Sequence, residues 1–299
     1  ECLPGVIERD EHQKFPKDQI EKLADLGFMG MMIYPVWGGS GMDTMSYVIA
    51  MEEISKIDAS TSVCMSVNNS LVCYGLQEFG TDEQKEKYLT PIAQGKKNGE
   101  LYLGAFLLSE PEAGSDATSQ RTTAIDMGDH YLLNGNKMWI TNGPDADLIV
   151  VYAKTDSSAG SRGISAFLVE KEFGFSCAQK LDKLGMRGSN TGELVFRDVE
   201  VPQQNLLGEL NRGAAVLMSG LDYERVVLAG RAQLSVVATR QIARGELICR
   251  RVLGHLCHRT LSAAFECWHV HAQEQRRMED LDRIVGGTAP WRGLPADQP

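Results

Sequence analysis

A single carboxylate interrupts an apolar helical stripe near residue 220. The stripe is spaced i, i+4, i+7 and i+11, so its members share one helix face: Leu217, Leu221, Glu224 and Leu228. A carboxylate on such a face is suited to act as a general base. Arg225 is rotated about 100° from Glu224 around the helix axis and need not neutralise its charge. The alternative is a glutamate at the edge of the stripe that is solvated or paired.

A loop of small and polar side chains follows the short apolar run at residues 101–108. Residues 108–116 read Leu-Ser-Glu-Pro-Glu-Ala-Gly-Ser-Asp. Pro111 and Gly114 shape a rigid backbone that can present N–H groups and two hydroxyls to a ligand. An ordinary surface turn is the alternative. The loop does not follow the G-x-G-x-x-G spacing, so it carries no Rossmann fingerprint.

A second candidate ligand segment comprises residues 137–143, Lys-Met-Trp-Ile-Thr-Asn-Gly. Trp139 and Thr141 lie two residues apart and so share one side of a strand. A flat indole face beside a hydroxyl suits a planar heteroaromatic ligand that accepts or donates one hydrogen bond at its edge. The alternative is a core tryptophan next to a turn.

Charge and hydropathy argue against two classes of partner. The net charge of the 299-residue chain is −10, which argues against binding nucleic acid through a basic surface. No stretch of 18 uncharged apolar residues occurs, so we expect no membrane-spanning helix. The 7 cysteines form no C-x-x-C pair and indicate reduced thiols in a reducing compartment.

No metal site is expected. Four cysteines and histidines near the C-terminus have the spacing C-x9-C-x-H-x-H, which contains neither a tight cysteine pair nor two histidines three to five residues apart; they are Cys257, Cys267, His269 and His271. Structural zinc sites normally show one of these spacings.

The order of predicted elements is helical, then β, then helical. Residues 1–100 show helical spacing, as at Ile20 and Leu23, and a capping box begins at Thr81. Short apolar runs separated by turn residues between 101 and 203 indicate an antiparallel β-domain. Helical spacing returns after Asn205. The sequence therefore predicts an α+β chain with a helical domain at 1–100, a β-domain at 101–203 and the start of a helical domain at 204–230.

The composition changes sharply after Gly230. All 13 lysines precede this residue, whereas 10 of the 17 arginines follow it. Such a step marks a domain boundary, a basic tail, or a fused or out-of-frame sequence. We treat residues 231–299 as a divergent tail and favour a truncated or frame-shifted C-terminus. Residue 1 is Glu and no signal-peptide pattern follows it, so we expect a processed start or a fragment.

Three segments in this order resemble the acyl-CoA dehydrogenase family, with a match from about Pro4 to Gly230. They are Leu108–Pro111 with Ala113–Asp116, Trp139–Gly143 and Lys183–Arg187. The resemblance implies a helical domain, a central β-domain and a C-terminal four-helix bundle, which would be truncated here. It also implies a homotetramer. The stretch that would hold the FAD diphosphate across a subunit interface does not follow Gly230, which argues against tetramer formation and tight FAD retention.

The resemblance also implies which residues meet FAD and substrate. Trp139 resembles the residue beside the flavin ring, and Thr141 resembles the one whose hydroxyl meets the N5 edge. The implied FAD contacts are Phe106, Leu107, Leu108, Ser109, Gly114, Ser115, Trp139, Ile140 and Thr141. The implied substrate contacts are Ser115, Ser161, Arg162, Asp222, Tyr223, Glu224 and Arg225.

The implied reaction is FAD-dependent α,β-dehydrogenation of a short or branched-chain acyl-CoA, with Glu224 as catalytic base. The segment Asp222–Gly230 resembles the isovaleryl-CoA branch, in which the catalytic glutamate lies on this helix. The first 140 or so residues resemble bacterial short-chain (butyryl) enzymes more closely, and Ala215 replaces a substrate-contacting tyrosine of the isovaleryl branch. A butyryl-CoA enzyme and a catalytically silent, truncated family member are therefore the alternatives.

The family resemblance also places the protein in metabolism. It implies an oxidoreductase acting on CH–CH bonds, a flavoprotein of leucine catabolism or fatty acid oxidation. It implies electron-transfer flavoprotein as the electron acceptor; an oxidase that uses oxygen directly is a further alternative. We expect a soluble protein of the bacterial cytoplasm or the mitochondrial matrix.

Overall fold

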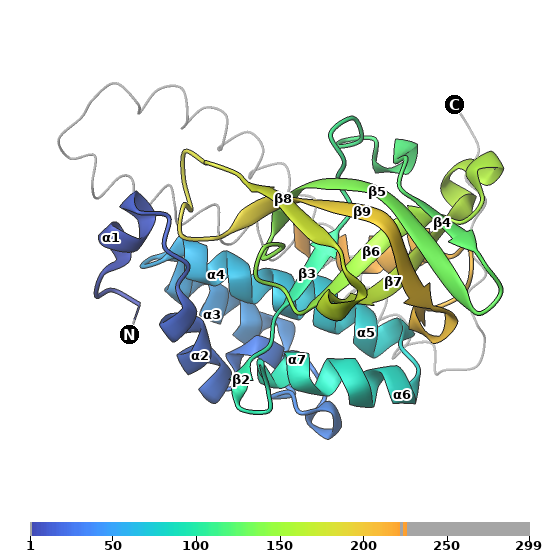
Figure 1. The fold of residues 1–299 in the computed structure, drawn as a ribbon. Helices are drawn as coiled ribbons and strands as arrows, with labels where there is room; N and C mark the ends of the chain where they lie inside the picture. The colour runs from blue at the N-terminus through green and yellow to red at the C-terminus, as the bar shows by residue number, and fades with distance from the viewer. Residues whose placement is uncertain (1, 222–223, 226–299) are drawn as a thin grey trace, which may run out of the picture. The chain divides into compact units, whose positions relative to one another are not determined.

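The computed structural model describes residues 2–221 and 224–225 (Figure 1). Asp222, Tyr223 and residues 226–299 lie outside the described residues, and with them the predicted divergent tail and the end of the predicted third domain. The domain limits given above remain predictions.

Helices form the first part of the chain. They are α1 (Val6–Glu11), α2 (Lys17–Asp25), α3 (Thr44–Ser55), α4 (Ala59–Ser66), α5 (Tyr74–Phe79), α6 (Asp82–Gln84) and α7 (Thr90–Gln94). The π-helical turn η3 (Val67–Cys73) joins α4 to α5, and η4 (Lys85–Leu89) joins α6 to α7. Short 3-10 turns, η1 (Phe28–Gly30) and η2 (Pro35–Trp37), lie between α2 and α3.

Side-chain caps fix where several helices begin. The Asp43 carboxylate accepts from the Ser46 N–H at the start of α3, and Asp58 does the same for Thr61 at the start of α4. The predicted capping box at Thr81 is confirmed, because Thr81 and Gln84 bond each other's backbone N–H reciprocally. Each such cap contributes about 1 kcal/mol to helix stability.

Strands follow the helices and form one mixed sheet. They are β3 (Gly104–Leu107), β4 (Thr123–Asp126), β5 (His130–Thr141), β6 (Leu148–Lys154), β7 (Ile164–Glu170), β8 (Ser176–Lys180), β9 (Thr191–Pro202) and β10 (Leu206–Leu207). The order is β10-β7-β6-β4-β5-β9-β8, and β3 pairs with β6. A separate short hairpin joins β1 (Lys96–Lys97) to β2 (Glu100–Leu101).

The predicted antiparallel β-domain is confirmed, with two parallel pairings that the sequence did not reveal. β3 runs parallel to β6 with Phe106 opposite Val150, and β4 meets the end of β6 in parallel at Thr123. β3 is therefore placed beside β6 by a long connection rather than by a hairpin. This placement brings the loop that follows β3 close to β5.

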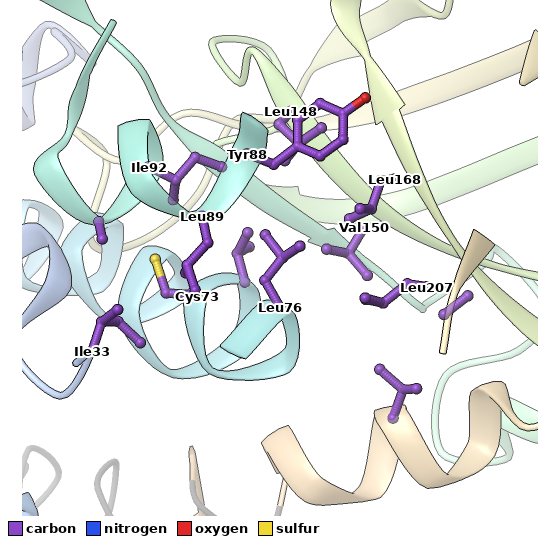
Figure 2. Close-up of a cluster of buried hydrophobic side chains, with 14 of the residues drawn as sticks. Ile33, Cys73, Leu76, Tyr88, Leu89, Ile92, Leu148, Val150, Leu168 and Leu207 are labelled. Carbon is purple, nitrogen blue, oxygen red and sulfur yellow. The ribbon is translucent and has the colours of Figure 1, made fainter. Parts of the chain in front are cut away.

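The strand β6 is buried on both faces, as its uninterrupted apolar run predicts. Leu148, Val150 and Tyr152 face one hydrophobic cluster, whereas Ile149 and Val151 face another. Figure 2 shows the first cluster, in which strand side chains meet side chains from the helices, among them Leu76. The labelled members are Ile33, Cys73, Leu76, Tyr88, Leu89, Ile92, Leu148, Val150, Leu168 and Leu207.

The opposite face of β6 and β7 is covered by strands rather than helices. Phe167 and Val169 of β7 pack in the second cluster with Leu133 of β5 and Phe196 of β9. The long pair β5–β9 thus lies over the side of β6 and β7 that faces away from the helices (Figure 1). None of the helices within residues 2–221 and 224–225 is long and apolar enough to cross a bilayer.

Candidate active site

The strand β5 contains a bulge that turns Trp139 outward. Lys137 lies opposite Leu194 of β9, and Ile140 lies opposite Gly192, so three steps along β5 match two along β9. Trp139 absorbs the extra residue with φ +65°, a left-handed conformation that non-glycine residues rarely adopt. Its side chain is 62% exposed. Such a strained, exposed aromatic residue points to a ligand contact.

The loop after β3 is attached to this bulge. The Met138 N–H donates to the Ser109 carbonyl at 2.9 Å. The Lys137 Nζ donates to the Leu108 carbonyl at 3.0 Å and to Glu110 Oε1 at 2.9 Å. The loop that presents Ser109 and the bulge that presents Trp139 are therefore parts of one connected surface.

The predicted FAD contacts divide into side chains that a ligand can reach and side chains that it cannot. Gly114, Ser115 and Trp139 are exposed. Phe106, Leu108, Ser109 and Thr141 are half-buried. Leu107 and Ile140 point into the second hydrophobic cluster, so only their backbone groups are available to a ligand.

Asn142 joins the strand end to the helices. Its Nδ2 donates to the Cys64 carbonyl of α4 and to the Gly104 carbonyl of β3, each at 3.2 Å. Its backbone N–H donates to the Asn190 carbonyl at 2.9 Å. Thr141, immediately before Asn142, is thereby fixed relative to α4.

Glu224 is buried against α4 and the adjoining turn η3. Residues 213–221 and 224–225 are helical, and Glu224 is 6% exposed. The Ser66 Oγ donates to Glu224 Oε1 at 2.6 Å, and the Ser70 Oγ contacts Glu224 Oε2. The predicted apolar face is confirmed in its described members, since Leu217 and Leu221 pack on the first hydrophobic cluster. Arg225 is exposed, and Leu228 lies outside the described residues.

The carboxylate of Glu224 also affects a neighbouring phenol. Tyr47 is fully buried, and its Oη lies 3.5 Å from the Ser70 Oγ. Burial, and then the negative charge of Glu224, raise the pKa of Tyr47 above its ordinary value. Tyr47 is therefore a neutral hydroxyl at the edge of this polar cluster.

The predicted substrate residues Ser161 and Arg162 lie on a neighbouring surface loop. Both are exposed in the turn η6 (Ser157–Gly163), which contacts the turn η5 (Ala117–Ser119). Ser115 lies two residues before η5. The structure thus gathers these three predicted contacts on adjacent loops at one edge of the sheet. Of the remaining predicted substrate contacts, Glu224 and Arg225 are described above, whereas Asp222 and Tyr223 lie outside the described residues.

Ser66, Ser70 and Lys137 have contacts in the candidate site that were not predicted from the sequence. The two serines are spaced i, i+4, which places two hydroxyls on one helix face. Lys137 occupies an inward position of β5, where the strand alternation otherwise places Tyr131 and Leu133. A lysine at a strand position whose side chain turns toward the core is the sequence signal for a buried ion pair.

Comparison with known protein families gives two matches in chain order. The N-terminal domain model of acyl-CoA dehydrogenases matches residues 1–96. The middle domain model of acyl-CoA dehydrogenases matches residues 105–199. The middle domain match includes the loop after β3, the Trp139 bulge and the turn η6.

Individual relatives match over different lengths. The mitochondrial isovaleryl-CoA dehydrogenase of Pongo abelii is 49% identical over 227 residues, which cover 75% of this chain and 52% of the relative. The structure of butyryl-CoA dehydrogenase from Megasphaera elsdenii is 36% identical with a TM-score of 0.79, over 92% of this chain and 76% of that chain.

A third relative was solved with a flavin. The acyl-CoA dehydrogenase of Bacillus anthracis in complex with FAD is 34% identical with a TM-score of 0.70, over 79% of this chain and 40% of that chain. The chain spans about half the length of the curated isovaleryl relative.

Proposed function

Because the chain belongs to the acyl-CoA dehydrogenase family, we propose that it catalyses FAD-dependent α,β-dehydrogenation of an acyl-CoA thioester. The substrate class is a short or branched-chain acyl-CoA, with isovaleryl-CoA preferred. The position of Glu224 in the helical residues 213–221 and 224–225 and the 49% identity to an isovaleryl-CoA dehydrogenase support this preference.

One observation carries the proposal. The candidate base and the candidate flavin segment meet at a single turn of α4, although both are distant from it in sequence. Ser66 bonds Glu224, and the Cys64 carbonyl two residues earlier accepts from Asn142, next to Thr141. A proton acceptor and a ligand-facing strand end are thus held by one rigid element, as the breaking of C–H bonds at two adjacent carbons requires.

The exposed residues fit a flavin. The Trp139 indole offers a flat apolar face, and Thr141 offers a hydroxyl on the same strand. Ser115 and Gly114 add an exposed hydroxyl and an unobstructed backbone, since a Cβ on Gly114 would meet no atom within 4 Å. Trp139 and Thr141 would hold the ring, and residues of the 108–116 loop would hold the rest of the flavin.

In the proposed reaction, Glu224 removes the proton from the α-carbon of the thioester and keeps it as a carboxylic acid. A bound flavin supplies the acceptor for the hydride that leaves the β-carbon. Ser66 and Ser70 hold the carboxylate oxygens in place. Burial excludes water from the carboxylate, so the proton goes to Glu224 rather than to solvent.

The experiment is anaerobic titration of the FAD-loaded chain with isovaleryl-CoA and with butyryl-CoA, followed at the visible flavin band. We expect bleaching by isovaleryl-CoA at lower concentration. Preferential bleaching by butyryl-CoA would assign the short-chain branch instead. A yellow protein that neither substrate bleaches would be a silent family member, and a chain that takes up no FAD would refute the proposal.

We further propose electron-transfer flavoprotein as the electron acceptor. The family resemblance supports this partner. The test is reoxidation of the substrate-reduced chain by purified electron-transfer flavoprotein without oxygen. Reoxidation by oxygen alone, with stoichiometric release of peroxide, would identify an oxidase and contradict this partner.

A further inference from the structure

Lys137 is a fully buried cation that none of the proposed chemistry uses. Its side chain is 0% exposed, and it is the first residue of the β5 bulge. Its Nζ donates to the Leu108 carbonyl at 3.0 Å, to Glu110 Oε1 at 2.9 Å and to Gln120 Oε1 at 2.7 Å. These acceptors use all three N–H groups of an ammonium.

The three acceptors lie at the two ends of the loop 108–120. Glu110 strengthens the closure, because its carboxylate also accepts from the backbone N–H groups of Arg121 at 2.6 Å and Thr122 at 3.0 Å. The Thr122 Oγ1 donates to the same carboxylate at 2.6 Å. The loop is therefore closed at its base, while Gly114 and Ser115 remain exposed.

The same cation holds this loop against the bulge. Lys137 binds Leu108 and Glu110 through its side chain, and the next residue, Met138, donates its N–H to Ser109. Trp139 follows directly and projects to the surface. The conformation of Trp139 and the position of the loop therefore depend on one set of contacts.

We propose that Lys137 is a positioning residue whose ammonium holds the loop 108–120 against the Trp139 bulge and thereby sets flavin affinity. Lys137 does not itself touch the flavin. The proposal rests on the FAD binding proposed above, and it assigns a role in that binding to Glu110 and Gln120 as partners of Lys137.

The electrostatics of the cluster are consistent with a retained charge pair. Burial lowers the pKa of Lys137 to about 8, although the charge of Glu110 opposes this shift. Burial acts to raise the pKa of Glu110, but the Lys137 charge and the hydrogen bonds from Arg121 and Thr122 outweigh it and hold that pKa below its ordinary value. A buried ion pair seldom stabilises a fold more than apolar side chains would. Here the ion pair holds the loop 108–120 in position.

The test compares three variants of the full chain. Lys137→Met removes the cation and leaves Glu110 buried without it. Lys137→Met combined with Glu110→Gln removes both charges. Arg9→Met is the matched control, since it breaks another buried ion pair, with Asp58 at 2.8 Å, outside the loop and the bulge.

Two readouts separate positioning from stability. The first is the FAD dissociation constant, measured by flavin fluorescence under conditions where each variant is folded. The second is hydrogen exchange at the Met138 amide, which bonds Ser109 and is altered by none of the substitutions. We expect the double variant to bind FAD about tenfold more weakly and to exchange faster at Met138. We expect Arg9→Met to change neither readout.

The outcomes are distinct. A double variant with wild-type FAD affinity would overturn the proposal, whatever its stability. Equal losses of FAD affinity in the double variant and in Arg9→Met would overturn it too, because general destabilisation would then explain both. A wild-type chain that binds no FAD would refute the proposed function; Met138 exchange that is unchanged in the double variant would then refute the positioning role independently.

Discussion

Two buried carboxylates in this protein are held in opposite ways. Glu110 and Glu224 are equally enclosed, each 6% exposed. Glu110 accepts from an ammonium, from two backbone N–H groups and from the Thr122 hydroxyl. Glu224 contacts the hydroxyls of Ser66 and Ser70, and within the described part of the chain it forms no ion pair.

The partners of each carboxylate decide whether it can accept a proton. A carboxylate paired with a buried cation cannot gain a proton without leaving that cation unpaired, so Glu110 remains charged and fixed. Hydroxyls can donate to a carboxylate and can rotate to accept from a carboxylic acid. The two serine hydroxyls therefore orient the Glu224 carboxylate and can stay bonded to it in either protonation state, as the proposed role of general base requires.

The largest expected effect comes from Glu224→Gln. We expect the rate of flavin reduction by isovaleryl-CoA to fall by about 10³-fold or more, because the amide cannot accept the α-proton. FAD affinity should stay unchanged. The measurement is stopped-flow absorbance without oxygen, with Glu209→Gln, an exposed glutamate, as control. Near-wild-type reduction in Glu224→Gln would remove Glu224 from the role of base.

Substitution in the ion pair of Lys137 and Glu110 is expected to affect stability more than substitution of Glu224. Lys137→Met should lower the free energy of unfolding by about 3–5 kcal/mol, because it leaves Glu110 buried without its cation. Glu224→Gln should lower it by no more than about 1 kcal/mol. Urea unfolding followed by circular dichroism measures both. Similar losses in the two variants would contradict the distinction between the two carboxylates.

The hydroxyls of Ser66 and Ser70 should affect rate and not flavin binding. We expect Ser66→Ala and Ser70→Ala each to slow flavin reduction by about tenfold, as loss of one hydrogen bond to a charged group implies. Ser62→Ala is the control, since Ser62 is buried on the same helix but bonds Ser55. A change in FAD affinity without a change in rate would show that these serines do not act through Glu224.

The last expected effect, a pH dependence of stability, is small over any one pH unit. The pKa of Lys137 is lowered by burial to about 8, against 10.5 for an ordinary lysine. Between these values the folded protein has released the proton that the unfolded chain still holds, so stability rises with pH. The free energy of unfolding of the wild type, relative to that of Lys137→Met, should rise by up to about 1.4 kcal/mol per pH unit. Urea titrations across this range test it; a flat or falling difference would contradict it.

Much of the fold could be predicted because its signals are local. The apolar runs of β6 and β7, the capping box at Thr81 and the stripe of Leu217 and Leu221 each follow from neighbouring residues. The parallel placement of β3 beside β6 could not be predicted in this way. It depends on packing between segments more than 40 residues apart, which no local period encodes.

The candidate site was predicted in part for a similar reason. Trp139, Ser115 and Glu224 belong to recognisable segments. Lys137 and Ser66 do not, because their partners are set by the tertiary fold: Glu110 lies 27 residues from Lys137, and Glu224 lies 158 residues from Ser66. A buried polar contact across such separations becomes visible only when the chain is folded.

The most direct test of the contrast between the two carboxylates is an infrared difference spectrum of the FAD-loaded chain before and after anaerobic reduction by isovaleryl-CoA. A carboxylate that accepts the α-proton acquires the C=O stretch of a carboxylic acid. We expect this band to appear in the wild type and in Glu209→Gln. A wild type that is reduced without forming the band would show that Glu224 does not receive the proton.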